Sequence, residues 1–296
     1  MVMNLFLKLK KREIKIILFT KLLKKLKKFL CRFTCPSILP WSEGYSDKRN
    51  SIIETIVDKI SITRFDFTKN IPQSYGYGID ERCIEIPWVF SKIRHKSKNI
   101  LDAGCAFFEF GCIRNSINNT NCYLLALNKQ DMFLNVKEKK YYRICGDLRN
   151  LPFKDNFFEC ITCISTIEHV GLDNTKLYST SNTFKENKIN DYLVAFKNLA
   201  MVLKPSGDLF ITLPFGKWKT HGWLQVFNEK MIDLLISATT LKLVEESIFI
   251  HKKSGWILSD RKQAANAIYY DIHKDKNRKS SLAAAEAVCC LWFHKQ

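Results

Sequence analysis

Residues 98–104, KNILDAG, constrain the fold more than any other stretch of this sequence. The pattern predicts a short buried strand at 99–101, a tight turn at 102–104 and a helix-like segment after it. A strand that enters a glycine turn and then a helix opens a parallel α/β sheet. Gly104 allows a sharp bend or a close approach to a ligand. The Asp102 carboxylate follows the strand, at the edge where open α/β sheets bind ligands.

Strand and helix patterns alternate through the rest of the chain. Further strands are predicted at 122–127, 141–145, 159–165, 208–213, 241–251 and 287–293. Helices are predicted at 48–62, 89–93, 191–203 and 227–237, with residues 204–207 as a stop signal and 173–188 as a surface loop. This alternation predicts an α/β fold with a doubly wound parallel sheet.

The basic N-terminal segment accounts for much of the net charge of +18 on this 296-residue chain. Between residues 14 and 33, apolar residues recur at helical spacing and lysines occupy the other face. Within residues 14–33 the longest uncharged run is 16–20, far too short to span a bilayer, which needs about 20 residues. A basic amphipathic helix of this kind favours an anionic membrane surface or a partner protein. The alternative is a solvated helix that packs on its own domain.

The 11 cysteines are scattered through apparent strands and helices. With no secretory signal in evidence, this pattern favours reduced, buried thiols in a cytoplasmic protein. Cys160 and Cys163 form a CxxC on a predicted strand, where side chains three residues apart point to opposite faces. Cys31 and Cys35 lack a second ligand pair, so no metal site is expected.

Three chemically active features are predicted at the carboxyl ends of consecutive strands, where a ligand crevice is expected. Asp102 offers a carboxylate to an ammonium or hydroxyl group. Asp147 offers hydrogen-bond acceptance to an amine, and His169, next to Glu168, is a candidate general base. Each alone is more often a helix cap or a loop residue. Their joint placement around one crevice favours a binding site.

The segments NILDAGC, GDLRNLPFKDNFFECITCISTIEHVG and LKPSGDLFITLPFG, in this order, are similar to class I S-adenosylmethionine-dependent methyltransferases over about residues 98–216. The flanking ERCIEIPWVF, HGWLQVFNEK and AAAEAVCCLWF resemble bacterial-type methyltransferases found beside glycan synthesis functions. The resemblance implies a Rossmann-like, seven-stranded sheet with a reversed last hairpin. The expected organisation is a basic helical extension at 1–38, a helical lead-in or lid at 39–97 and the methyltransferase domain at 98–296.

The resemblance also implies roles for individual residues. Asp102, Gly104 and Cys105 match the motif that holds the methionine part of the cofactor. Asn128 stands where an acid pairs with the ribose hydroxyls. Asp147 and Leu148 match the adenine contacts, and residues 165–169, from Ser165 to His169, match the segment beside the transferred methyl. We expect His169 to be the catalytic base, with Glu168 as the alternate.

Two residues depart from the family pattern. The glycine-rich run is replaced by residues 105–108, in which Phe107 would crowd the turn unless it points away. Asn128 replaces an acid and brings no charge, although an amide still hydrogen-bonds to hydroxyls. Trp218, His221, Trp223 and Gln225 follow the fifth strand, where we expect the acceptor pocket.

These observations predict a methyltransferase that uses S-adenosylmethionine and no metal. The expected reaction is O-methylation of a polar small-molecule or glycan acceptor, in the cytoplasm or at an anionic membrane surface contacted by residues 1–35. One alternative is a weakly active or inactive methyltransferase-like binding protein anchored by its basic N-terminus. A nucleic-acid methyltransferase is suggested by the charge, but residues 166–169 lack the Asn/Asp-Pro-Pro-aromatic run of amino-methylating enzymes. A nicotinamide-dependent dehydrogenase is disfavoured because no GxGxxG follows the first strand.

Overall fold

A computed structural model describes residues 39–63, 65–93, 97–117, 120–128, 140–178, 182–274 and 282–296. Residues 40–296 form one compact unit. The predicted basic helix and its proposed membrane contact, together with Cys31 and Cys35, lie outside the described residues.

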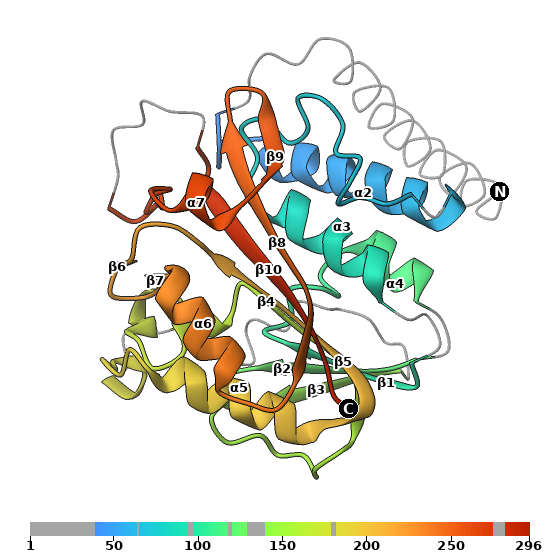
Figure 1. Ribbon diagram of the computed structural model, residues 1–296, viewed down its shortest axis with the longest axis vertical. Helices are drawn as coiled ribbons and strands as arrows, with labels where there is room; N and C mark the ends of the chain where they lie inside the picture. Colours follow the sequence, from blue (N-terminus) through green and yellow to red (C-terminus); the bar gives the residue numbers. More distant parts are fainter. Residues whose placement is uncertain are drawn as a thin grey trace, which may run out of the picture. The chain divides into compact units, whose positions relative to one another are not determined.

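An eight-stranded sheet organises the described part of the chain (Figure 1), in the order β3-β2-β1-β4-β5-β10-β8-β9. The strands β1 (Asn99–Ala103), β2 (Asn121–Ala126), β3 (Tyr141–Cys145), β4 (Phe158–Ile164) and β5 (Leu203–Pro214) are mutually parallel. Because the chain starts in the middle of this order and moves first to one edge and then to the other, the sheet is doubly wound. The Rossmann-like α/β fold is therefore confirmed.

The strand pairs between β5 and the β9 edge of the sheet are antiparallel. β10 (Ala287–His294) lies antiparallel between β5 and β8 (Lys242–Lys252), as expected for the reversed last hairpin. The prediction of seven strands missed β9 (Gly255–Ser259), which pairs antiparallel with β8. Gly255 permits this tight return because its φ is +88°, and an added Cβ would lie 2.5 Å from the Tyr75 carbonyl oxygen.

Helices cover both faces of the sheet (Figure 1). α2 (Tyr45–Thr63) packs on α3 (Arg82–Lys92) and α4 (Gly111–Ser116), and α3 lies against β4 and β10. On the other face lie α5 (Asp191–Val202) and α6 (Glu229–Ser237), with α7 (Arg261–Ala264) beside β8. Short elements complete the fold: η2 (Ile167–His169), η3 (Asn174–Lys176), η4 (Asn182–Phe184), β6 (Lys219–Thr220) and β7 (Gln225–Val226).

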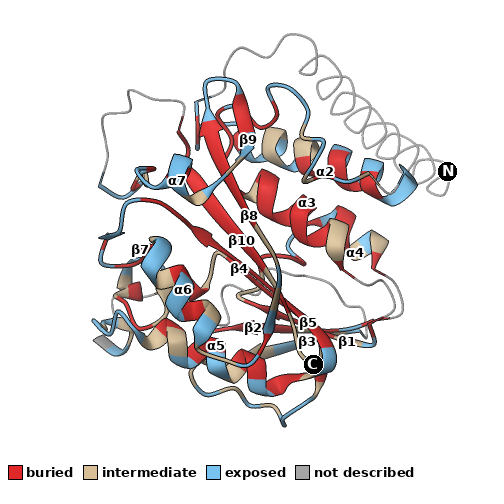
Figure 2. Ribbon diagram, in the orientation of Figure 1, coloured by how far each residue is buried: buried red, intermediate tan, exposed pale blue. Residues whose placement is uncertain are grey.

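The core is built on β4 and β5, whose central residues are buried on both faces (Figure 2). Ile161, Leu209 and Ile211 are fully buried, as strands between two helical layers require. The buried faces of α5 and α6 join the same cluster through Phe196 and Ile232. This rigid centre fixes the positions of the loops that leave the carboxyl ends of the strands.

Two predicted element boundaries were wrong. Residues 204–207 belong to β5 and bulge out of it, since the pairing register shifts there and Ser206 and Gly207 bond to the backbone of Lys295 instead. α3 begins at Arg82, seven residues before its predicted start. Its internal Pro87 removes the helical donor for the Cys83 carbonyl, and the Tyr75 hydroxyl replaces that donor at 2.6 Å.

Candidate active site

A cavity of about 640 Å³ opens at the carboxyl ends of the parallel strands. It runs from the turn after β1, past the ends of β2 and β3, to η2. Among the described residues, its lining includes Gly104, Cys105, Asp147, Leu148, Ser165 and His169. Six of the nine predicted site residues therefore face one space, whereas Asp102, Asn128 and Glu168 do not line it.

Gly104 makes the turn at the floor of the cavity. Its φ is +104° and its N–H donates to the Leu125 carbonyl at 2.8 Å. A Cβ at this position would lie 2.0 Å from Oγ1 of Thr166, so no larger residue fits without rearrangement. Cys105 follows with φ of +61°. The turn thus brings the backbone of the β1 loop against η2, as the close packing of a ligand-binding turn requires.

Asp102 supports this loop from behind. Its buried carboxylate accepts hydrogen bonds from the Phe108 N–H at 2.9 Å and the Thr162 hydroxyl at 3.0 Å. Burial raises the pKa of Asp102 to about 6, although these hydrogen bonds favour the charged form. Phe107 is also fully buried, packs edge-on against Phe108 and does not line the cavity. The Asp102 carboxylate thus bonds to the loop and to β4, and Asp102 does not line the cavity.

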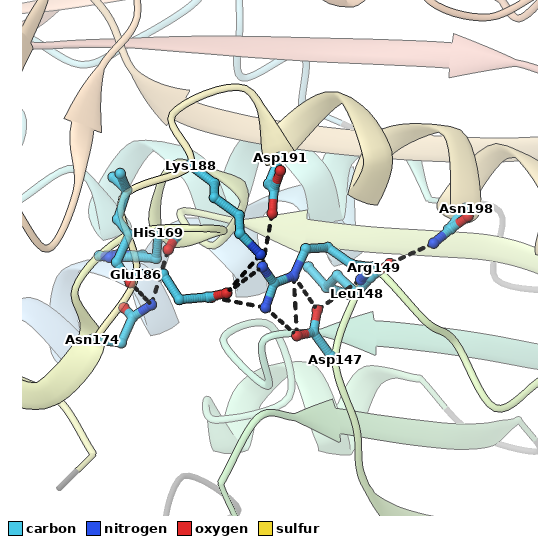
Figure 3. A network of polar contacts seen from close by, with 10 residues as sticks. Asp147, Leu148, Arg149, His169, Asn174, Glu186, Lys188, Asp191 and Asn198 are labelled. Atoms are coloured by element: carbon cyan, nitrogen blue, oxygen red, sulfur yellow. Dashed lines mark hydrogen bonds and ion pairs between the residues drawn. The ribbon is translucent and has the colours of Figure 1, made fainter. Parts of the chain in front are cut away.

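A charged cluster forms one wall of the cavity (Figure 3). Arg149 lies at its centre and binds the Asp147 carboxylate through Nε at 3.1 Å and Nη2 at 2.6 Å. The same guanidinium bonds to Glu186 at 2.9 Å and to Asp191 at 2.8 Å. Hydrogen bonds from Arg149 lower the pKa of Asp147 despite its partial burial. Asp147 is therefore an ionised acceptor whose orientation is fixed by its neighbour.

Beside Asp147, Leu148 lines the cavity and its carbonyl accepts a hydrogen bond from the Asn198 side chain at 3.2 Å. Asn128 lies two residues beyond β2. The last residues of that strand and the following Leu127 line the cavity, whereas Asn128 does not.

His169 occupies the opposite end of the cavity. Its Nδ1 lies 2.8 Å from the carbonyl oxygen of Trp223, and its ring stacks on the Trp223 ring at 5.2 Å. A carbonyl only accepts hydrogen bonds, so Nδ1 carries the proton in the neutral ring and Nε2 holds the lone pair. Burial lowers the pKa of His169 to about 4. The imidazole is therefore neutral near pH 7, with Nε2 as a hydrogen-bond acceptor.

Glu168, the alternate base, is buried and turned away from the cavity. Burial and the nearby Glu85 carboxylate raise the pKa of Glu168 well above its usual range. Its Oε1 lies 4.0 Å from Nε2 of His169, too far for a hydrogen bond. Neighbouring residues of a 3₁₀ turn point in different directions, which explains why only His169 faces the cavity.

Arg82 and Glu85 of α3 were not among the predicted site residues. The buried Glu85 carboxylate accepts hydrogen bonds from Ser165 at 2.6 Å, Thr212 at 2.7 Å and Arg82 at 2.5 Å. Arg82 also lines the cavity. The i, i+3 spacing of a basic and an acidic residue indicates an ion pair, but their contact with β4 and β5 needed the fold.

The residues expected to line an acceptor pocket after β5 do not line this cavity. Trp218 is exposed, whereas His221 and Gln225 are buried behind the wall. Trp223 contacts the cavity only indirectly, through His169. The tertiary structure thus uses this segment to support the site, because the β6–β7 hairpin packs beneath η2.

A doubly wound sheet with a glycine turn after β1 and an ionised acid after β3 defines a nucleotide-binding α/β domain. Residues 101–211 match the family model described as a methyltransferase domain. This part of the chain is therefore similar to a methyltransferase domain.

Parts of this chain are similar to known proteins. An uncharacterised protein of Methanocaldococcus jannaschii is 30% identical over 131 residues, which are 44% of this chain and 47% of that protein. The chain thus matches about half the length of this relative. An S-adenosylmethionine-dependent methyltransferase from Aquifex aeolicus is similar with a TM-score of 0.45 and 10% identity, covering 82% of this chain and 98% of the other.

A third similar protein is the 1,6-didemethyltoxoflavin-N1-methyltransferase of Burkholderia thailandensis, solved with S-adenosylhomocysteine. Its TM-score is 0.41 at 10% identity, covering 89% of this chain and 93% of the other. The match to the methyltransferase domain covers residues 101–211.

The residues that line the cavity fit S-adenosylmethionine. The cavity volume lies within the range of about 300–1,000 Å³ typical of small-molecule sites. Gly104 leaves free backbone where a Cβ would block the turn, and Asp147 places an ionised acceptor beside the apolar Leu148. Asp147 can accept a hydrogen bond from an amine, and Leu148 can pack against an aromatic base.

Proposed function

We propose that this chain transfers a methyl group from S-adenosylmethionine to a hydroxyl of a polar small molecule or glycan, with His169 as the base. The observation that carries this proposal is that one cavity joins the Gly104 turn, Asp147 and His169. That these residues line a single space supports the proposal, because a methyl donor and an acceptor must be held side by side to react.

The cofactor would be held at the β1–β3 end of the cavity. The Gly104–Cys105 backbone would hold its methionine part, and Asp147 would accept from the adenine amine beside Leu148. Ser165 leaves β4 at the level of the reacting group, and its hydroxyl is fixed by Glu85 at 2.6 Å. When bound, S-adenosylmethionine supplies an electrophilic methyl group.

His169 would handle the proton of the acceptor. Its Nε2 carries the free lone pair, so an acceptor hydroxyl donates its hydrogen bond there and is oriented for attack. As the oxygen forms its new bond, its proton moves to Nε2. The low pKa of His169, about 4, keeps this nitrogen unprotonated throughout the neutral range.

A polar acceptor suits the remaining walls of this end of the cavity. Arg82 lines the cavity, and its hydrogen bonds to described side chains use Nη1 alone. Asn174 and Tyr178 line it as well. Hydrogen-bonding groups around a basic nitrogen favour a sugar or another hydroxylated molecule. The glycan assignment also draws on the resemblance of the flanking segments to methyltransferases near glycan synthesis functions.

Membrane association remains a proposal about the basic segment 1–35. Within the residues that the structure describes, no helix is both long and apolar enough to cross a membrane. Vesicle binding tests the idea directly. If the full chain binds anionic and neutral vesicles equally, the proposed role of the basic segment is wrong.

The first experiment is calorimetric titration of S-adenosylhomocysteine into the full chain. Micromolar binding is expected. Turnover is then screened with mono- and oligosaccharides by release of S-adenosylhomocysteine, comparing the wild type with His169→Asn. General-base catalysis contributes about 10²–10⁴-fold, so the variant is expected to lose at least about 100-fold in turnover while still binding S-adenosylhomocysteine.

Either step is able to overturn the proposal. A folded chain that does not bind S-adenosylhomocysteine at millimolar concentration is not an active enzyme, and the methyltransferase-like binding protein would replace this reading. A His169→Asn variant with full turnover would remove His169 as the base while leaving cofactor use intact.

A further inference from the structure

Trp223 holds His169 from two sides. The Trp223 carbonyl oxygen lies 2.8 Å from Nδ1, and the indole ring stacks on the imidazole with 29° between their planes. The carbonyl selects the tautomer, and the stacked ring restricts rotation of the imidazole. Trp223 does not line the cavity, so it acts on the site through His169 alone.

Asp271 in turn holds Trp223. Its Oδ2 lies 3.4 Å from the indole Nε1 and 3.2 Å from Nδ1 of His221. Its Oδ1 accepts the backbone N–H of His273 at 3.0 Å. The Asp271 carboxylate is 1% exposed and is also outside the cavity lining. A buried carboxylate needs several donors, and these three fix its position.

The surrounding backbone makes this arrangement rigid. The Asp173 N–H donates to the Gly222 carbonyl at 2.9 Å, which ties the loop after η2 to the β6–β7 hairpin. Within the hairpin, the His221 N–H donates to the Leu224 carbonyl at 2.9 Å. The ring of Trp223 is enclosed further by Tyr269 and His273. The rings of His169, Tyr269 and His273 therefore all contact the Trp223 indole.

We propose that Asp271 and Trp223 are positioning residues that keep His169 in the tautomer with a free Nε2 pointing into the cavity. Asp271 holds the indole in place, and Trp223 in turn holds the imidazole through its carbonyl oxygen and its stacked ring. The inference rests on the proposed role of His169, but its structural part is separately measurable. Positioning matters because a misplacement of about 1 Å costs a catalyst on the order of 100-fold.

The test is ¹⁵N NMR of the full chain with labelled histidines. The chain has six histidines, and the His169 signals are assigned by their loss in His169→Asn. In the wild type at pH 7, we expect Nδ1 to be protonated and Nε2 to give an unprotonated, pyridine-type signal. In Asp271→Ala, we expect exchange-averaged signals from both tautomers, because the indole is released.

Two further variants keep the test decisive if Asp271→Ala does not fold. Trp223→Phe keeps the backbone carbonyl and an aromatic face but loses the bond to Asp271, so partial averaging of the His169 signals is expected. Asp271→Asn keeps an oxygen for the indole N–H and is expected to preserve the single tautomer. That conservative rescue separates positioning from a general loss of stability.

The chain offers a matched control. Asp208 also accepts hydrogen bonds from a tryptophan and a histidine, Trp292 at 3.0 Å and His294 at 2.9 Å. It pairs with Cys160 near the start of β4, away from the carboxyl ends of the strands where the cavity opens. Asp208→Ala is therefore expected to leave the His169 signals unchanged. Affinity for S-adenosylhomocysteine is expected to stay within about twofold in every variant, because the cofactor end of the cavity is untouched.

The proposal is overturned if His169 keeps one Nδ1-protonated tautomer in folded Asp271→Ala or Trp223→Phe. It is overturned equally if Asp208→Ala averages the signals as much as Asp271→Ala does. Failure of the wild type to bind S-adenosylhomocysteine would contradict the proposed function instead. The NMR result would still decide whether Asp271 and Trp223 control the imidazole.

Discussion

The guanidinium of Arg149 binds the carboxylate of Asp147, its neighbour but one, through both Nε and Nη2. The side chain that the cofactor would use is thus already oriented by the chain itself. Glu186 and Asp191 hold Arg149 from the other side, so the orientation does not depend on one flexible residue. These contacts hold the charged Asp147 carboxylate in one orientation at the wall of the cavity.

Asp147→Ala is expected to weaken S-adenosylhomocysteine binding. A hydrogen bond to a charged acceptor contributes about 1.5–3 kcal/mol, which corresponds to roughly 10- to 100-fold in affinity. Calorimetry measures the change directly. Asp191→Asn is the matched control, because Asp191 binds Arg149 but does not line the cavity. Equal affinities of the two variants would show that Asp147 makes no contact with the nucleotide.

Gly104→Ala is expected to destabilise the fold more than Gly222→Ala. Both glycines have positive φ, +104° and +91°, so both substitutions carry a backbone cost of about 1–2 kcal/mol. Only at Gly104 does the new Cβ meet Thr166, whereas nothing lies within 4 Å at Gly222. Urea unfolding compares the two variants. Adding Thr166→Ala to Gly104→Ala should restore part of the loss, and its failure to do so would contradict the steric explanation.

Glu85→Ala is expected to destabilise the chain by about 3 kcal/mol, since it removes a fully buried carboxylate and leaves the half-buried Arg82 without this partner. The Ser165 and Thr212 hydroxyls would lose their acceptor as well. Glu85→Gln keeps the shape and should cost less. Arg261→Ala, which breaks contacts to partly exposed acids, is the surface control, with about 1 kcal/mol or less expected. Similar unfolding midpoints for Glu85→Ala and Arg261→Ala would refute the difference.

Acid is expected to destabilise the chain through His169 and His251. Burial lowers the pKa of each from 6.5 to about 4. The folded state therefore binds fewer protons than the unfolded state between these values. Stability is complete above pH 6.5 and is lost as the pH falls towards 4, by up to about 3 kcal/mol for each group.

Urea unfolding of the wild type and His251→Gln at pH 7 and pH 4.5 measures this loss. Because His251 Nε2 accepts the Gly78 N–H at 3.0 Å, the variant has its own cost at pH 7. Its further loss on acidification should be smaller than that of the wild type. His273→Gln, at an exposed site, is the control. Identical losses in all three proteins would contradict the assignment to His251.

Local patterns predicted most of the sheet correctly. The strand at 141–145 was predicted to the residue although none of its residues is buried, and the others were displaced by a few residues. Burial on both faces of a central strand such as β4 leaves a continuous apolar run that needs no long-range information. The position of Gly104, Asp147 and His169 near one crevice also followed from their places after strands. The carboxyl ends of parallel strands meet at one edge whatever the details of packing.

Side-chain direction was not predictable in the same way. Asp102 and Glu168 stand beside residues that face the cavity, but both are buried away from it. In a turn or a 3₁₀ helix, small changes in backbone angles redirect a side chain completely. Phe107 is a further example, since the turn directs its side chain into the core and leaves the cavity open.

The sequence by itself determined the α/β fold, the doubly wound order and the edge that carries the site, because these depend on periodicity and on glycine turns. Only the tertiary structure decided which partners hold the site. Glu85 reaches Ser165 across 80 positions of the chain, and Trp223 reaches His169 across 54. Such contacts leave no local signal, since each depends on helices and hairpins packing against the same strands.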